Sequence, residues 1–191
     1  MMTNLASQPK LLTGNRVYLR PMNGEDAQMY YEQLYVAETR RLTGTHKFAT
    51  KEQISRYIEA KSQDSSSVLL LIALKETDEV IGDIALQDID TINRSAGIRI
   101  AISYEQHQGQ GFGQEGMQLL LEYGFGVLNL YRIELEVFTF NPRAAHVYEK
   151  LGFVREGVKR KALYYNHQYH DVVTMSMLAD EYRAKYSIPE S

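Results

Sequence analysis

The chain has 191 residues, a net charge of −3 and 44% hydrophobic residues, so it is long enough for one buried core and short for two. We expect one domain over residues 14–186, with flexible termini at 1–13 and 187–191. The charge offers no basic field for nucleic acid, and neither a membrane-spanning run nor a signal segment is evident, so we expect a cytoplasmic protein without nucleic-acid or membrane partners.

The first half of the chain mixes strand and helix patterns. Alternation over residues 16–21 predicts a strand, and helical spacing over residues 27–35 predicts a helix. Residues 39–50 are poorly patterned and are expected to form substrate loops. Thr50, with Gln53 three residues later, resembles a capping box that opens a second helix.

The rest of the chain also alternates between predicted strands and helices. Strands are predicted at residues 68–75, 80–88, 96–103, 132–138, 153–164 and 169–178, and helices over 117–128, from Asn141 and over 180–186. We find no internal repeat or interdomain linker.

A glycine-rich loop, Gln108–Gly113, lies between the strand and the helix that are predicted on either side of it. Gly109, Gly111 and Gly113 permit positive φ and leave no Cβ in the way, so several N–H groups can converge at a helix N-terminus. This arrangement is typical of an anion site, and it favours a phosphorylated cofactor.

Two cofactors compete for this loop. Residues 111–116 spell G-x-G-x-x-G, with Glu134 and Glu136 roughly 20 residues on, as a dinucleotide site would need. However, Ser103–His107 separates the loop from the strand and is too long for that tight turn. The spacing therefore favours coenzyme A, while a plain glycine-rich turn remains open because a lone glycine motif is a weak signal.

A second motif, Asn141–Phe153, reads as a short helix with both ends marked. Asn141 suits the N-cap, Pro142 the first helical position and Gly152 a left-handed C-cap. Helical spacing places four residues on one face, where a slender ligand could rest: Ala144, Ala145, Tyr148 and Leu151. A buried core tyrosine is the alternative for Tyr148.

Together, the two motifs make the sequence resemble the GNAT superfamily of N-acetyltransferases, in the branch of ribosomal-protein N-acetyltransferases and the bacterial spermidine acetyltransferase. The likeness extends from Asn15–Pro21 through Val80–Gly82 to Asp171–Met175. It implies a single α/β (α+β) domain. The expected fold is a mixed twisted sheet of about seven strands, with helices on both faces and a cofactor gap between the fourth and fifth strands.

The resemblance also implies a site for acetyl-CoA. The pyrophosphate would lie on the loop Gln108, Gly109, Gln110, Gly111, Phe112 and Gly113, and pantetheine along Ile100, Ala101 and Ile102. Asn141 and Ala144 would contact the cofactor, as would Tyr148, which the resemblance also makes the general acid. Because the chain has no cysteine, the acceptor amine would attack the thioester directly in a ternary complex. No metal is implied.

The acceptor is less well defined. We expect a protein N-terminus or a small amine. Spermidine or another polyamine is an alternative, weakened because Leu42–Phe48 has no carboxylate and Gly97 replaces an acidic residue of the spermidine enzymes. A general base is left open among Asp88, Glu105, Glu134, Glu136 and His46. The resemblance implies a homodimer, and a non-catalytic coenzyme A sensor remains a rival.

Overall fold

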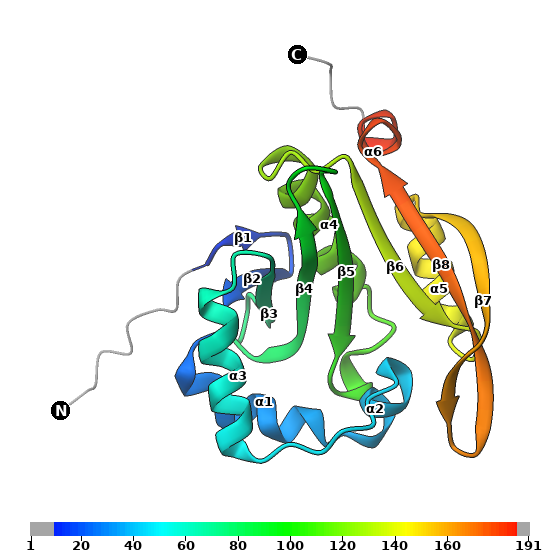
Figure 1. Ribbon diagram of the computed structural model, residues 1–191. Coiled ribbons are helices and arrows are strands. Elements are labelled where there is room, and N and C mark those ends of the chain that lie inside the picture. The colour runs from blue at the N-terminus through cyan, green and yellow to red at the C-terminus, as the bar shows by residue number, and fades with distance from the viewer. Residues whose placement is uncertain (1–9, 187–191) are drawn as a thin grey trace.

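The computed structural model describes residues 10–186, which form an eight-stranded sheet in the order β1-β2-β3-β4-β5-β6-β8-β7 (Figure 1). The strands are β1 (Leu12–Thr13), β2 (Val17–Pro21), β3 (Val68–Leu74), β4 (Val80–Asp90), β5 (Ser95–Ile102), β6 (Arg132–Phe138), β7 (Val154–Tyr165) and β8 (Gln168–Leu178). The helices are η1 (Gly24–Asp26), α1 (Ala27–Leu34), α2 (Ala37–Thr43), α3 (Lys51–Gln63), η2 (Glu105–His107), α4 (Phe112–Gly126), α5 (Pro142–Leu151) and α6 (Ala179–Tyr186).

The mixed sheet confirms the predicted fold class. The longer strands correspond to those expected from the sequence, and the additional strand is the two-residue β1, which pairs with β2 through Leu12 and Leu19. The strand β1 therefore lies before residue 14, the expected start of the domain. The expected terminal segments 1–9 and 187–191 lie outside the described residues.

One strand pair creates the gap that the family resemblance implied. Among the strand pairs of residues 10–186, only β5 and β6 run parallel, and their register covers just Ser95–Arg132, Ala96–Ile133 and Gly97–Glu134. Beyond these positions the two strands splay apart (Figure 1). A sheet with one parallel pair is not the doubly wound sheet that a dinucleotide fold requires.

Helices cover both faces of the sheet, as expected, because β-strand side chains alternate between faces. On β3, Ile72 packs in the larger core cluster with Met117 and Leu120 of α4. Its neighbour Leu71 points the opposite way and packs with Ile54 of α3 in a smaller cluster. The two clusters fix α4 and α5 on one face, and α1 and α3 on the other.

The structure departs from the sequence prediction in α2, which lies where loops were expected. None of its seven residues is buried, so the sequence shows no hydrophobic period there. Local contacts define it instead: Arg41 pairs with Glu38, and Gly44 ends the helix in the left-handed region at φ 64°. The Gly44 backbone lies so close to Phe138 of β6 that a Cβ would be 2.9 Å from its ring.

The glycine loop also needs a correction. Gly109 and Gly111 have positive φ, at 74° and 85°, but Gly113 lies inside α4, which begins earlier than the predicted residue 117. What Gly113 provides is close packing, because a Cβ there would lie 3.4 Å from Ile102 and 3.5 Å from Ile100. The glycine therefore lets the helix rest directly on the end of β5.

A buried ion pair fixes the start of α1. Arg20 donates to both carboxylate oxygens of Asp26, at 2.7 and 2.9 Å, and Asp26 also accepts from the backbone N–H of Asn23 at 2.9 Å. The two side chains are only 7% and 9% exposed. A buried charge is costly without its partner, so this pair locks η1 and α1 against β2.

We expect Asp26→Asn to lower the free energy of unfolding by about 3–5 kcal/mol, because it leaves the Arg20 charge buried and unpaired. The matched control is Glu149→Gln, which breaks the exposed pair between Glu149 and Arg155 and should cost less than about 1 kcal/mol. Urea unfolding measures both. Equal losses in the two variants would show that burial of the Arg20–Asp26 pair does not matter.

Candidate active site

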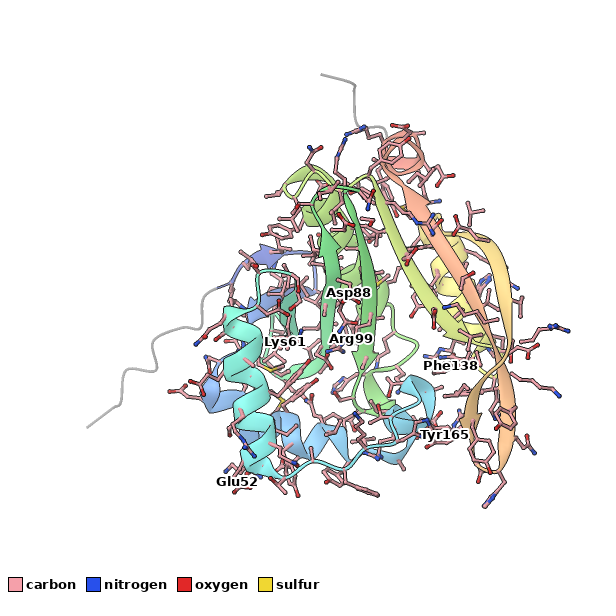
Figure 2. All side chains as sticks on the ribbon, in the orientation of Figure 1. Glu52, Lys61, Asp88, Arg99, Phe138 and Tyr165 are labelled. Carbon is pink, nitrogen blue, oxygen red and sulfur yellow. The ribbon has the colours of Figure 1, made fainter. Side chains whose placement is uncertain are left out.

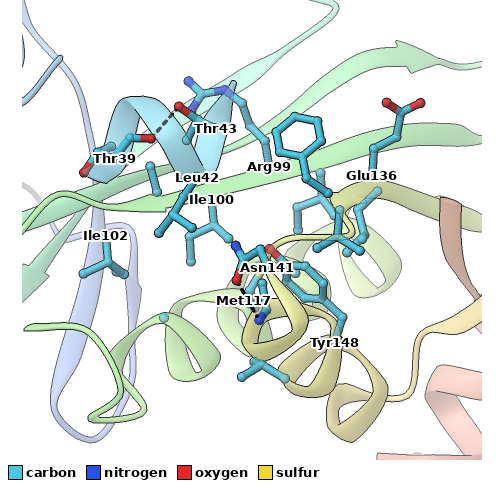
Figure 3. A pocket seen from close by; sticks show the side chains of 18 of the residues that line it. Thr39, Leu42, Thr43, Arg99, Ile100, Ile102, Met117, Glu136, Asn141 and Tyr148 are labelled. Carbon is cyan, nitrogen blue, oxygen red and sulfur yellow. Dashed lines mark hydrogen bonds between the residues drawn. The ribbon is translucent and has the colours of Figure 1, made fainter. Parts of the chain in front are cut away.

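A groove of about 1390 Å³ passes through the sheet at the gap between β5 and β6. Figure 3 shows Tyr148 and Asn141 of α5 on one side, and Thr39 and Leu42 of α2 on the other. The wall formed by the glycine loop, α4 and α5 is here called the donor wall, and it includes Gln108, Gly109, Gly111, Gly113, Met117, Asn141, Ala144 and Tyr148. The opposite wall is called the acceptor wall, and it includes Tyr30, Gln33, Leu34, Thr39, Leu42, Tyr57, Asp83, Asp88 and Arg99.

The glycine loop closes one end of the donor wall. Gly111 is the N-cap of α4, so the unpaired N–H groups of the first helical turn meet the groove at the positive end of the helix dipole. The Gln108 side chain donates to the carbonyl of Ile102 at 3.2 Å and ties the loop to the end of β5. Such an arrangement suits a phosphate group.

The end of β5 offers an open strand edge. Ile100, Ala101 and Ile102 line the groove and lie beyond the last residue that pairs with β6. On their other edge they pair with β4, through Ile84, Asp83 and Gly82. An unpaired strand edge can accept an extended, amide-bearing ligand as an added strand. Pantetheine has this character.

Tyr148 projects from α5, whose predicted ends are confirmed. The Asn141 side chain accepts from the N–H of Ala144 at 3.2 Å, Pro142 is the first helical residue, and Gly152 ends the helix at φ 108°. The Tyr148 ring is partly buried, 6.1 Å from the Phe153 ring, and its hydroxyl makes no hydrogen bond within residues 10–186. Burial raises the pKa of Tyr148 to about 12, so the phenol stays protonated at neutral pH and can donate a hydrogen bond.

The groove brings together the residues singled out from the sequence, apart from two. Ile100, Ala101, Ile102, Gln108, Gly109, Gly111, Gly113, Asn141, Ala144 and Tyr148 all line it. Gln110 and Phe112 do not. The carbonyl of Gln110 and the ring of Phe112 instead contact Arg16 from the start of β2, a residue that sequence reasoning did not single out.

The acceptor wall contains an ion pair between Asp83 of β4 and Arg99 of β5, which are neighbouring strands. Figure 2 labels Arg99. Asp83 is 5% exposed. Tyr30 and Tyr57 stack above the pair with their ring centroids 6.3 Å apart, and burial followed by the Asp83 charge raises the pKa of Tyr30. The pair was detectable in principle, because both charges interrupt apolar strands.

A buried network joins the acceptor wall to β5. Ser103, just after β5, donates through its hydroxyl to Gln33 of α1 at 2.8 Å, and its carbonyl accepts from the hydroxyl of Thr39 in α2 at 2.8 Å. Gln33 also donates to the carbonyl of Val80 at 3.3 Å. Helices α1 and α2 are thus hydrogen-bonded to the end of β5, the same strand end that Gln108 contacts through Ile102. Polar residues of this kind follow no helical or strand period, so no sequence pattern indicates them.

Most carboxylates near the groove are already paired. Arg132 donates to Glu134 at 2.8 Å and to Glu156 at 2.7 Å, and holds the pKa of the Glu156 carboxyl down at about 2. Glu136 pairs with Lys159. The Asp88 side chain is exposed on the acceptor wall and makes no hydrogen bond or ion pair within residues 10–186. Its charge acts on the ammonium of Lys61, whose pKa is raised first by Asp64 and to a lesser extent by Asp88.

Of the residues left open as a general base, Asp88, Glu134 and Glu136 line the groove, and Glu105 and His46 do not. Within residues 10–186, no group of three or more His, Cys, Asp or Glu side chains is arranged to hold a metal ion. No helix in that part of the chain is long and apolar enough to span a bilayer.

Comparison with known proteins agrees with this geometry. The spermidine N(1)-acetyltransferase of Escherichia coli K12 is 30% identical over 178 residues, covering 93% of this chain and 94% of that protein. A structure of the Vibrio cholerae spermidine N-acetyltransferase in complex with CoA and spermine superposes with a TM-score of 0.83 at 27% identity, covering 88% of this chain and 99% of that one. A dodecameric structure of the same Vibrio enzyme in an intermediate state has a TM-score of 0.77 at 27% identity, covering 90% and 99%.

The sequence also matches the family model for the acetyltransferase (GNAT) domain over residues 16–154, which is most of the chain. That range contains β2 to β6, the glycine loop and all of α5. The predicted resemblance, including its spermidine branch, is confirmed. The chain therefore belongs to the GNAT family of N-acetyltransferases.

Proposed function

We propose that this protein transfers an acetyl group from acetyl-CoA to the primary amine of a small molecule. The observation that carries the proposal is the groove that crosses the sheet where β5 and β6 separate. A donor and an acceptor entering from opposite faces would meet there, beside the open edge of β5 and the hydroxyl of Tyr148. Bringing two reactants together in this way supplies much of the rate enhancement in group transfer.

The donor wall fits acetyl-CoA part by part. The loop Gln108–Gly113 would hold the pyrophosphate through backbone N–H groups at the start of α4. The strand edge at Ile100–Ile102 would pair with the pantetheine amides, and Asn141 and Ala144 would border its path. Acetyl-CoA supplies an activated thioester carbonyl when bound. The solved Vibrio relative in complex with CoA supports this assignment.

Residues of this chain would then assist the transfer itself, at the thioester carbonyl and at the departing sulfur. The backbone at the end of β5 would polarise the carbonyl as the amine nitrogen forms the new C–N bond and the C–S bond breaks. Tyr148 would donate a hydrogen bond to the departing sulfur. The resemblance makes Tyr148 a general acid, but its pKa of about 12 lies above that of a thiol, so we propose that the phenol donates this hydrogen bond and keeps its proton. The proton lost by the amine passes to solvent and balances the charge of the thiolate.

A small amine is the acceptor class that the relatives support. The Escherichia coli and Vibrio enzymes described above act, by name, on spermidine, and one structure contains spermine. These enzymes give no support to a peptide N-terminus, which the sequence had also suggested, so we do not propose it. The two walls enclose the groove with aromatic and apolar side chains such as Tyr30, Leu34 and Leu42, a lining that suits a slender ligand.

Within this class, spermidine is the leading candidate. The segment Leu42–Phe48 has no carboxylate, and the nearby Glu38 is paired with Arg41. A polycation would therefore be held by Asp88, and by Glu134 or Glu156 where an amine replaced Arg132 as the partner of the carboxylate. All three carboxylates line the groove.

We also propose that the protein acts as a homo-oligomer in the cytoplasm. The dodecamer of the Vibrio relative supports self-association, whereas the family resemblance in the sequence implied a dimer. On this chain, β7 is the last strand of the sheet and leaves Val154 and Val158 more than half exposed. Exposed sheet edges of this kind are sites where a second chain can pair.

The deciding assay measures thiol release from acetyl-CoA with spermidine, spermine, monoamines, aminoglycosides and N-terminal peptides, beside calorimetric titration of the protein with acetyl-CoA. We expect saturable turnover with an amine of the small-molecule class, and spermidine as the preferred acceptor. Tight binding of acetyl-CoA without turnover on any amine would instead favour a coenzyme A sensor. Absence of acetyl-CoA binding would overturn the assignment of the loop.

We expect Tyr148→Phe to lower kcat by about 100-fold, because it removes the hydrogen bond that stabilises the leaving sulfur. The Kd for coenzyme A should stay within about twofold, since the ring remains. Steady-state kinetics and calorimetry measure the two values. Tyr169→Phe is the matched control, because Tyr169 is 64% exposed on β8 and does not line the groove. If Tyr148→Phe kept full kcat, the phenol would have no role in the chemistry.

The pH dependence follows from the raised pKa of Tyr148. The phenol stays protonated at neutral and moderately alkaline pH and loses its proton only as the pH rises through about 12. The acceptor amine, in contrast, must be neutral, so kcat/KM for the acceptor should rise up to about pH 10. A pH–rate profile should therefore lack a falling limb between pH 8 and 10. A falling limb there that vanished in Tyr148→Phe would contradict the assignment.

A further inference from the structure

The carboxylate of Glu115 joins the first turn of α4 to the start of β2. Its Oε1 accepts from the backbone N–H groups of Arg16, at 2.7 Å, and Val17, at 3.1 Å. Its Oε2 accepts from the Nε of the Arg16 side chain at 3.3 Å. The Glu115 side chain is only 15% exposed. Burial alone would raise the pKa of this carboxyl, but these donors hold it below its usual value.

The same arginine reaches from Glu115 into the glycine loop. Its Nη1 donates to the carbonyl of Gln110 at 2.9 Å, and its guanidinium carbon lies 4.7 Å from the centre of the Phe112 ring. Between these two residues, a Cβ on Gly111 would lie 3.0 Å from Nη2. One guanidinium therefore contacts three consecutive loop residues, and Glu115 fixes where that guanidinium lies.

This contact determines the direction of a backbone N–H in the loop. In a planar trans peptide the carbonyl and the following N–H point in opposite directions. Because the Gln110 carbonyl points at Arg16, the N–H of Gly111 points away from Arg16, and Gly111 lies in the wall of the groove. Gly111 adopts this geometry at φ 85°, in the left-handed region that glycine reaches without a Cβ clash.

The opposite side of Glu115 is packed as well. A Cβ on Gly14 would lie 2.4 Å from its Oε1, so the turn between β1 and β2 rests directly on the carboxylate. Gly14 donates to the carbonyl of Val17 across that turn. Neither Glu115 nor Arg16 lines the groove, so neither is placed to touch the reacting atoms.

We propose that Glu115 and Arg16 are positioning residues, which hold the glycine loop in the conformation that receives the phosphates of acetyl-CoA. The inference rests on the proposed function and adds to it the residues that set affinity for the nucleotide half of the donor. If the pair were merely structural, its substitution would lower stability and would affect turnover of every donor equally. A positioning pair affects only donors that carry the phosphates.

The test compares two donors, acetyl-CoA and S-acetylpantetheine, which has the thioester and the pantetheine arm but no pyrophosphate or nucleotide. For Arg16→Ala and Glu115→Gln, we expect KM for acetyl-CoA to rise about tenfold or more, from loss of a hydrogen bond to a charged group, with kcat little changed. For S-acetylpantetheine, kcat/KM should be unchanged. Glu115→Gln keeps the shape and an acceptor oxygen for the β2 backbone, so the fold is retained.

A double-mutant cycle sharpens the test. If Glu115 acts through Arg16, the variant carrying both substitutions should have the same KM for acetyl-CoA as Arg16→Ala alone. The matched control is Asp78→Asn, which removes a carboxylate contact to the hydroxyl of Tyr18 on the same strand, 3.0 Å long, without touching the loop. It should leave both donors unaffected.

Two outcomes would overturn the proposal while leaving the proposed function intact. One is an unchanged KM for acetyl-CoA in both single variants, and the other is an equal loss with the two donors. If the unaltered protein itself neither bound coenzyme A nor used either donor, the proposed function would fail, and this inference with it. Thermal melting of each variant confirms that the kinetics are measured on folded protein.

Discussion

The structure depends on a parallel strand pair that is left unfinished. β5 and β6 pair through Ser95, Ala96 and Gly97 and then separate, while each keeps its antiparallel partner on the other side. Because β4 and β8 continue to hold the two strands, the sheet keeps its order across the opening. An exposed strand edge is normally a liability in a folded protein. Here it lies inside a groove, where a ligand of the right shape can complete it.

The opening also separates two chemical environments within one core. The donor side offers the first-turn N–H groups of α4, apolar side chains such as Met117 and Val147, and the hydroxyl of Tyr148. On the acceptor side, charges alternate along the strands and are largely neutralised in pairs such as Asp83 with Arg99. Among the carboxylates that line the groove within residues 10–186, Asp88 alone makes no ion pair.

Sequence reasoning succeeded where a pattern has a period or a punctuating residue. The alternation of Arg132–Phe138 gave β6 at its observed bounds, and Asn141, Pro142 and Gly152 gave α5. It failed where tertiary contacts decide. The helix α2 has no buried face, so no hydrophobic period predicts it. The contact of Arg16 with Gln110 joins residues 94 apart in the chain, so no local sequence pattern predicts it either. The roles of the site residues rest on the resemblance, because spacing places side chains but does not assign their chemistry.

The network at the end of β5 has a thermodynamic consequence. Two neighbouring carbonyls of this short segment are held from opposite sides, that of Ile102 by Gln108 of the glycine loop and that of Ser103 by Thr39 of α2. A ligand that displaces either partner moves the same few backbone atoms. Binding at the glycine loop and binding beside α2 then share a coupling free energy. By reciprocity, each ligand changes the affinity for the other by the same factor.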